Sequence, residues 1–171
     1  MSETCAACGF VYDIDAASEA GPEIVRGAGE IADIIASRAD NPRERPSADV
    51  WSTLEYACHL RDVLLVQRER VLLARREIRP SLVPMGRDER AEHDGYNEQL
   101  PSDVARQLRD AAALFANVLA RLDDEQWKRT VLYNFPAPAE RDLAWVAVHT
   151  QHEVHHHLGD VRAQVVDRPE N

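Results

Sequence analysis

The chain has 171 residues, of which 44% are hydrophobic and 6% aromatic, and its formal net charge is −10. A chain of this length buries roughly two thirds of the surface that its unfolded form exposes, so we expect one self-supporting domain. The acidic balance argues against nucleic acid and anionic membrane surfaces as partners, because both attract basic proteins. No segment approaches the ~20 apolar residues of a membrane-spanning helix, and the N-terminal residues do not resemble a signal peptide. The sequence therefore predicts a cytoplasmic protein that binds a small molecule, with homodimer formation left open.

The first predicted helix begins at Gly21-Pro22, because proline is favoured in the first turn of a helix. Its apolar residues, such as Ile24 and Ile31, recur at helical spacing as far as about Asp40. Asn41-Pro42 then ends the helix, since the residue before a proline is disfavoured in the helical region.

The second predicted helix begins after Ser47 or Ser52, either of which can cap it, and ends near Arg79 before Pro80. Residues 80–101 are then polar and irregular. A loop of this length in a compact domain is usually either a functional cover or a mobile segment, and the sequence leaves both open.

Two further helices follow along the chain. Ser102 is predicted to cap the third helix, which runs to about Leu122, and the fourth runs from about Asp142 to Val166. Residues 128–141, between them, are interpreted as a second irregular stretch that contains prolines. Strand-forming runs do not recur along the chain. The expected fold class is therefore all-α, a four-helix bundle.

The predicted bundle spans residues 16–171 and follows a short extension, residues 1–15, that contains Cys5-Ala6-Ala7-Cys8-Gly9. A C-x-x-C pair followed by glycine resembles one half of a zinc ribbon, but a ribbon needs two such pairs and Cys58 is the remaining cysteine. Three interpretations stay open: a second metal completed by His93 or by another subunit, a redox pair, or reduced cysteines without a special role. An isolated C-x-x-C in an acidic cytosolic protein favours the last.

Five of the seven histidines of the chain lie in the fourth predicted helix. His149, His152 and His156 fall within about 60° of one another on an otherwise apolar face, whereas His155 and His157 are assigned to solvent or supporting roles. Buried imidazoles without partners are costly and tend to charge near pH 6, so metal binding explains this face better than plain packing. His152 and His156 are four residues apart and can reach one ion from consecutive helical turns.

A catalytic metal usually has three protein ligands, so a third must come from elsewhere in the chain. His59 is the one histidine on another predicted helix, at the edge of that helix's inward face. It is therefore the leading candidate, with His149 second and His93 third. Zinc is the expected ion, with nickel, iron and manganese as alternatives.

The same residues also match a second motif. His152-Glu153-Val154-His155-His156 fits H-E-x-x-H, the zinc peptidase pattern in which the glutamate is the general base. The extended motif requires a third histidine at the position that Arg162 occupies here. Little chain remains after His156 to build a substrate cleft, so a zinc peptidase is the least favoured interpretation.

Three segments resemble the DinB/YfiT-like superfamily: 51–63 (WSTLEYACHLRDV), 95–97 (GYN) and 152–161 (HEVHHHLGDV). The resemblance covers about residues 16–166. It implies a four-helix bundle with one metal-binding histidine from the second helix and two from the fourth. These positions correspond to His59, His152 and His156.

The resemblance also implies a type of chemistry. Better-understood relatives, including mycothiol-dependent maleylpyruvate isomerases and bacillithiol transferases, use the metal to activate a low-molecular-weight thiol. By this resemblance, the chain is expected to use such a thiol for transfer to, or isomerisation of, a small electrophile. Glu153 and Asp160, at the edge of the ligand face, are the candidate catalytic residues because either could orient an imidazole or move a proton. Tyr96 and Asn97 are candidate substrate-binding residues. The alternative is a non-catalytic metal-containing module that binds or senses a ligand, which a closed four-ligand site would favour.

Overall fold

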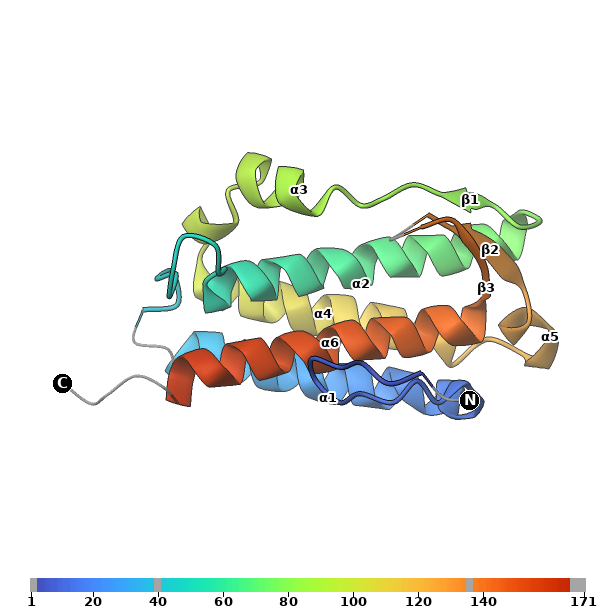
Figure 1. Cartoon of the computed structure of the whole chain (residues 1–171), viewed down its shortest axis with the longest axis horizontal. Helices are drawn as coiled ribbons and strands as arrows, with labels where there is room; N and C mark the ends of the chain where they lie inside the picture. Colours follow the sequence, from blue (N-terminus) through green and yellow to red (C-terminus); the bar gives the residue numbers. More distant parts are fainter. Residues whose placement is uncertain (1–2, 39–40, 135–136, 167–171) are drawn as a thin grey trace.

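Four long helices run side by side along the molecule (Figure 1). They are α1 (Ala20–Asp33), α2 (Thr53–Arg76), α4 (Pro101–Leu119) and α6 (Leu143–Val166). The structure is a computed structural model, which describes residues 3–38, 41–134 and 137–166. Helices α4 and α6 each pack against both α1 and α2, so α1 and α2 occupy opposite corners of the bundle. The predicted four-helix bundle is confirmed.

The start of α2 is fixed by a capping box. The Ser52 hydroxyl accepts a hydrogen bond from the Glu55 N–H at 3.1 Å, and the Glu55 carboxylate accepts one from the Ser52 N–H at 2.8 Å. Ser52 is therefore the cap, rather than the alternative Ser47. The carboxylate of Glu55 also binds Arg45, which ties the preceding loop to this helix end. Burial of Glu55 is compensated by these contacts, which lower its pKa below the ordinary value.

The other helix ends lie close to their predicted positions. Pro22 falls in the first turn of α1, which a short 3-10 helix (Ile14–Glu19) precedes and a π-helical turn (Ile34–Arg38) follows. The predicted end of this helix at about Asp40 lies outside the described residues. Helix α4 begins at Pro101, one residue before the predicted cap. At the start of α6, the Asp142 carboxylate accepts a hydrogen bond from the Trp145 N–H at 2.7 Å.

A small sheet interrupts the otherwise helical architecture, so the expectation of a strictly all-α fold is wrong in this detail. Strands β1 (Ser81–Leu82), β2 (Thr130–Tyr133) and β3 (Ala139–Asp142) lie in that order, with β1 parallel to β2 and β2 antiparallel to β3. Each strand is too short for an alternating pattern to be recognised in the sequence. The parallel pair also joins segments about fifty residues apart, which no local pattern indicates.

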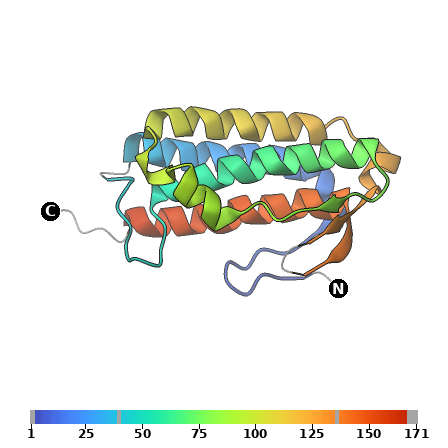
Figure 2. The same ribbon diagram turned by 90° about the horizontal axis from the view of Figure 1, so that it is seen from above.

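The two stretches interpreted as irregular also contain short helices. They are α3 (Arg87–His93), the 3-10 helix η3 (Tyr96–Glu98) and α5 (Asp124–Trp127). The segment with β1 and α3 extends along α2 and covers its outer side (Figure 2). Within the described residues, no helix combines the length and apolar character needed to cross a membrane.

The N-terminal extension forms a small hairpin beside α6 (Figure 2). Thr4 and Val11 form an antiparallel bridge, and the Tyr12 N–H donates to the Glu3 carbonyl at 2.8 Å. The rings of Phe10 and Tyr12 contact His152 on α6, with centroids 5.4 and 5.2 Å away. The hairpin therefore covers one face of α6, and the histidine-rich part of the helix lies beneath it.

A close approach between α1 and α6 sets how α6 lies in the bundle. Gly27 of α1 faces Val154 of α6, and a Cβ atom at position 27 would lie 2.7 Å from Val154 Cγ1. Real Cβ atoms do not come this close, and valine in a helix has one strongly preferred rotamer, so it cannot turn aside without cost. Only glycine allows this spacing between the helices.

We expect Gly27→Ala to destabilise the fold by about 1–3 kcal/mol, because the added methyl group overpacks the α1–α6 contact. Gly29→Ala is the matched control, since a Cβ atom there meets nothing within 4 Å. The control should stabilise the protein by up to ~1 kcal/mol, because alanine is the better helix former. Urea unfolding of both variants measures the difference, and equal shifts in midpoint would contradict the close-approach argument.

Candidate metal centre

Helix α6 presents its candidate metal ligands on two separate stripes. His152 and His156 form one stripe, and Glu153 and His157 form the other, about 100° around the helix. The first stripe lies under the N-terminal hairpin, and the second faces α2. These two positions decide which residues each stripe can join.

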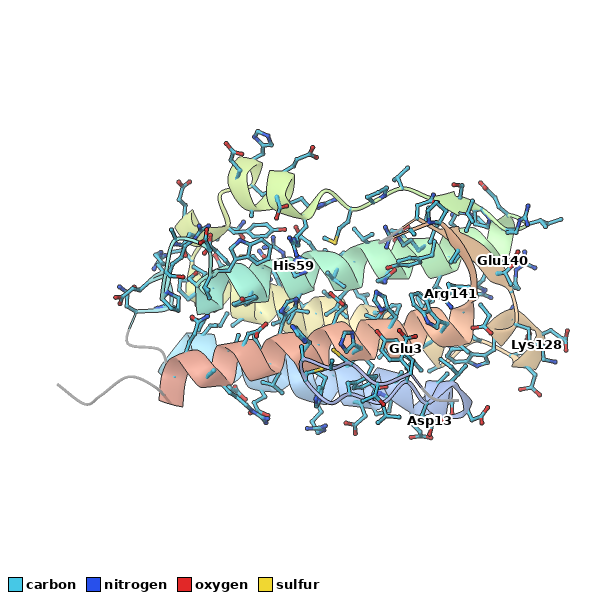
Figure 3. All side chains as sticks on the ribbon, viewed as in Figure 1. Glu3, Asp13, His59, Lys128, Glu140 and Arg141 are labelled. Carbon is cyan, nitrogen blue, oxygen red and sulfur yellow. The ribbon has the colours of Figure 1, made fainter. Side chains whose placement is uncertain are left out.

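The stripe that faces α2 meets His59. Ligand atoms of His59, Glu153 and His157 all lie within 4.8 Å of one another. His59 is 3% exposed, and the side chains of His157 and Glu153 are 15% and 27% exposed. His157 Nε2 lies 3.9 Å from Glu153 Oε2, and Figure 3 shows His59 on α2. Two imidazoles and one carboxylate are a donor set that suits a catalytic zinc ion.

His157 is oriented by Asp160 on the same helix. Its Nδ1 lies 2.8 Å from Asp160 Oδ2, so Nδ1 donates to the carboxylate and Nε2 is left as the ligand atom. Burial alone would raise the pKa of Asp160, but the hydrogen bond from His157 lowers it below its ordinary value. Asp160, predicted as a catalytic candidate, is therefore placed to position His157.

His59 is an imidazole that the protein keeps neutral. Burial disfavours its charged form, the nearby His157 adds repulsion, and together they lower the pKa of His59 to about 3. Neutral imidazole is the form that binds metal ions. The Nδ1 atom of His59 is also buried without a hydrogen-bond partner. A buried imidazole left in this state is costly, and a metal ligand role accounts for it.

A cavity of about 270 Å³ adjoins the three candidate ligands, and all three line it. Its floor contains Tyr133, whose hydroxyl accepts hydrogen bonds from Gln67 at 2.9 Å and Arg70 at 3.1 Å. Arg70 is held by neutral acceptors, including the Val83 carbonyl at 2.6 Å. The remaining wall comes from α2, from the segment between β1 and α3, and from the first residues of α3: Val63, Val66, Pro84, Met85, Gly86, Arg87 and Asp88. The covering loop therefore closes one side of the space beside the candidate metal centre.

The structure divides the triad that the sequence predicted. His152 and His156 group with Cys5 and Cys8 of the N-terminal hairpin, and among the described residues no such group joins either histidine to His59. His157 does not point into solvent: its side chain is 15% exposed, and its ring centroid lies 5.3 Å from that of His59 on α2. The buried apolar face of α6 is also not the one predicted from the sequence, which contains His149, His152 and His156. The face that packs against the bundle contains Ala147, Thr150, Val154, Leu158 and Val161, all buried.

The two predicted substrate-binding residues lie elsewhere. Tyr96 is fully buried, and its hydroxyl donates to Asp62 Oδ2 at 2.7 Å. Asn97 accepts a hydrogen bond from the Ser52 hydroxyl at 2.8 Å. Tyr96 attaches the covering segment near the middle of α2, Asn97 attaches it to the cap of α2, and neither residue lines the cavity.

The remaining histidines take different positions. His149 stacks on Trp145, with ring centroids 4.5 Å apart, and its Nδ1 lies 3.0 Å from the Tyr12 hydroxyl. Burial lowers the pKa of His149 to about 4. It can form a group with His152 and Glu153, but not with His59. His93, at the end of α3, and His155, on α6, are exposed.

Comparisons with known proteins agree with this architecture. The family model of the DinB superfamily matches residues 37–161. The chain therefore belongs to the DinB superfamily. Its fold is similar to a solved structure described as "YfiT from Bacillus subtilis is a probable metal-dependent hydrolase with an unusual four-helix bundle topology". That similarity has a TM-score of 0.68 and 19% sequence identity, and covers 88% of this chain and 86% of that chain. A search among curated proteins gave no match.

Replacement of either histidine in the group of His59, Glu153 and His157 should abolish metal binding there. We expect His59→Ala and His157→Ala each to lower the metal content by about one ion per chain, since a carboxylate and one imidazole bind too weakly to survive purification. Elemental analysis of the purified variants measures this loss. His155→Ala, on the same helix but exposed, is the matched control and should keep the parent's metal content. Unchanged metal in His157→Ala would exclude the assignment.

Proposed function

We propose that the protein is a metal-dependent enzyme that activates a low-molecular-weight thiol for reaction with a small electrophile. One observation carries this proposal: His59, Glu153 and His157 bring ligand atoms together at the wall of a cavity. A site with three protein ligands beside an open space is typical of a catalytic zinc ion, which keeps one position for water or substrate. A purely structural ion would be enclosed by four ligands.

Bound zinc lowers the pKa of a coordinated thiol, so that the nucleophilic thiolate forms at neutral pH. The chain's own residues then have distinct tasks. Asp160 holds His157 in one orientation, and burial keeps His59 neutral. Arg70, whose contacts here are to uncharged acceptors, provides positive charge at the cavity floor. An anionic group on the thiol or on the electrophile, such as a carboxylate, fits this position.

Hydrolysis by the same centre is the second candidate. A donor set of two histidines and one glutamate also occurs in zinc hydrolases, where metal-bound water is the nucleophile. The related fold of YfiT, described as a probable metal-dependent hydrolase, favours the same alternative. The zinc peptidase interpretation gains no support, because neither His152 nor His156 lines the cavity and both group with Cys5 and Cys8.

A cobalt-loaded sample separates thiol activation from hydrolysis. Addition of cysteine, glutathione, bacillithiol or mycothiol should produce new thiolate-to-cobalt absorption, because the thiol sulfur enters the open position. The spectrum recorded before thiol addition is subtracted, so that absorption from any sulfur ligand within the protein does not contribute to the signal. His59→Ala should show no change. If no thiol alters the spectrum while simple amides or esters are hydrolysed, water is the nucleophile and the thiol proposal fails.

Glu153 can be tested as a ligand rather than as a general base. Glu153→Ala should lose metal to about the same extent as His157→Ala, whereas Glu153→His should keep it, because imidazole can replace the carboxylate as a donor. Titration with a competing chelator measures the affinities of the two variants. A Glu153→Ala variant that binds metal as tightly as the parent would show that Glu153 is not a metal ligand.

A further inference from the structure

The N-terminal hairpin places two thiols over the second stripe of α6. Ligand atoms of Cys5, Cys8, His152 and His156 all lie within 4.8 Å of one another. Tetrahedral zinc with sulfur and nitrogen ligands separates its ligand atoms by about 3.3–3.8 Å. The four side chains therefore need only small movements to surround one ion. We propose that Cys5, Cys8, His152 and His156 form a second, structural zinc site that fastens the N-terminal hairpin to α6.

The backbone of the hairpin is shaped to present both thiols. The Gly9 N–H donates to the Cys5 carbonyl at 2.9 Å, and the Cys5 N–H donates to the Phe10 carbonyl at 2.8 Å. Gly9 has a φ of 72°, a left-handed conformation that glycine adopts without strain. The N–H groups of Cys8 and Ala7 point at the Cys5 sulfur, and the Phe10 N–H points at the Cys8 sulfur. Such donors stabilise negative charge on metal-bound thiolates.

The two histidines each keep a ring nitrogen available. His152 Nε2 and His156 Nδ1 are buried and have no hydrogen-bond partner in the described structure. Buried unsatisfied nitrogens are uncommon, and here two of them belong to one group of four potential ligands. Metal binding satisfies both.

The other ring nitrogen of each histidine lies near a polar group of the protein. His152 Nδ1 lies 2.9 Å from the Tyr12 hydroxyl, which is also 3.0 Å from His149 Nδ1. One proton arrangement satisfies all three groups: His152 Nδ1 donates to Tyr12, and Tyr12 donates to His149. This arrangement leaves His152 Nε2 unprotonated for the metal. His156 Nε2 lies 3.8 Å from Asp160 Oδ2, so a carboxylate faces this ring as well.

The ligand set indicates a structural role. Two thiolates and two imidazoles with C-x2-C and H-x3-H spacing enclose zinc completely and leave no open position. This site therefore differs from the group of His59, Glu153 and His157, which opens onto the cavity. The main effect of metal binding is to hold the hairpin against α6, because the site joins residues 5–8 to residues 152–156.

Cobalt substitution and metal analysis test this site independently of the catalytic proposal. The parent chain, loaded with cobalt under reducing conditions, should show thiolate-to-cobalt absorption without any added thiol. Cys5→Ser and Cys8→Ser should lose this absorption together with about one metal ion per chain, while Ala6→Ser in the same turn keeps both. His59→Ala should also keep the absorption. Sulfur absorption that is absent from the parent, or unchanged in both cysteine variants, would overturn the proposal.

Alkylation of the unmodified chain gives a second measurement that does not depend on how the variants fold. Cys5 and Cys8 should react slowly in the zinc-loaded protein and at least tenfold faster after a strong chelator removes the metal, because bound thiolates are shielded. Peptide mass analysis locates the modified residues, and buried Cys58 serves as the internal slow reference. Equal rates for Cys5 and Cys8 with and without the chelator would exclude zinc ligation.

Discussion

The rotation of α6 about its own axis is the constraint on which both candidate metal sites depend. Val154 packs against Gly27 of α1, where only glycine leaves enough room. Leu158 and Val161 continue the same buried stripe. This contact turns Glu153 and His157 toward α2, and it leaves His152 and His156 on the outer face of the helix, about 180° from the core stripe. A rotation of α6 by about 100° would turn His152 and His156 toward α2 and would turn Glu153 and His157 toward the core.

The two groups that result differ in the chemistry they can support. One combines residues of α2 and α6 beside a cavity, with a carboxylate to orient one imidazole and a positive charge at the cavity floor. The other combines the N-terminal hairpin with α6 and offers a complete set of four ligands. An open centre suits the activation of a thiol or water, whereas an enclosed one suits attachment of a segment. The histidine-rich part of α6 thus contributes to two candidate metal sites, for which we propose a catalytic and a structural role.

The covering segment contributes to the open centre through two anchors. Tyr96 donates to the buried Asp62, and Asn97 accepts from Ser52 at the start of α2. Between these anchors and β1, the chain passes over α2 and supplies one wall of the cavity. The loop's polar sequence therefore reflects several specific attachments to α2. Short elements such as α3 are stable here because they pack on the bundle, which sequence patterns do not report.

The sequence by itself determined the bundle and the positions of its helices. Pro22 near the start of α1, Ser52 at the cap of α2 and the periodic apolar residues act locally, so they can be read without tertiary information. The sequence also indicated that candidate metal ligands lie on α6 and at His59 of α2, and the structure places such groups there. Only the tertiary structure decided which side chains of α6 accompany His59. His152 and His156 are four residues apart, and so are Glu153 and His157. The spacing alone therefore does not reveal which of the two pairs faces α2. The answer depends on the contact between Gly27 and Val154, two residues far apart in the chain. Local sequence patterns also cannot predict which residues Cys5 and Cys8 approach, because the hairpin meets α6 only in the folded protein.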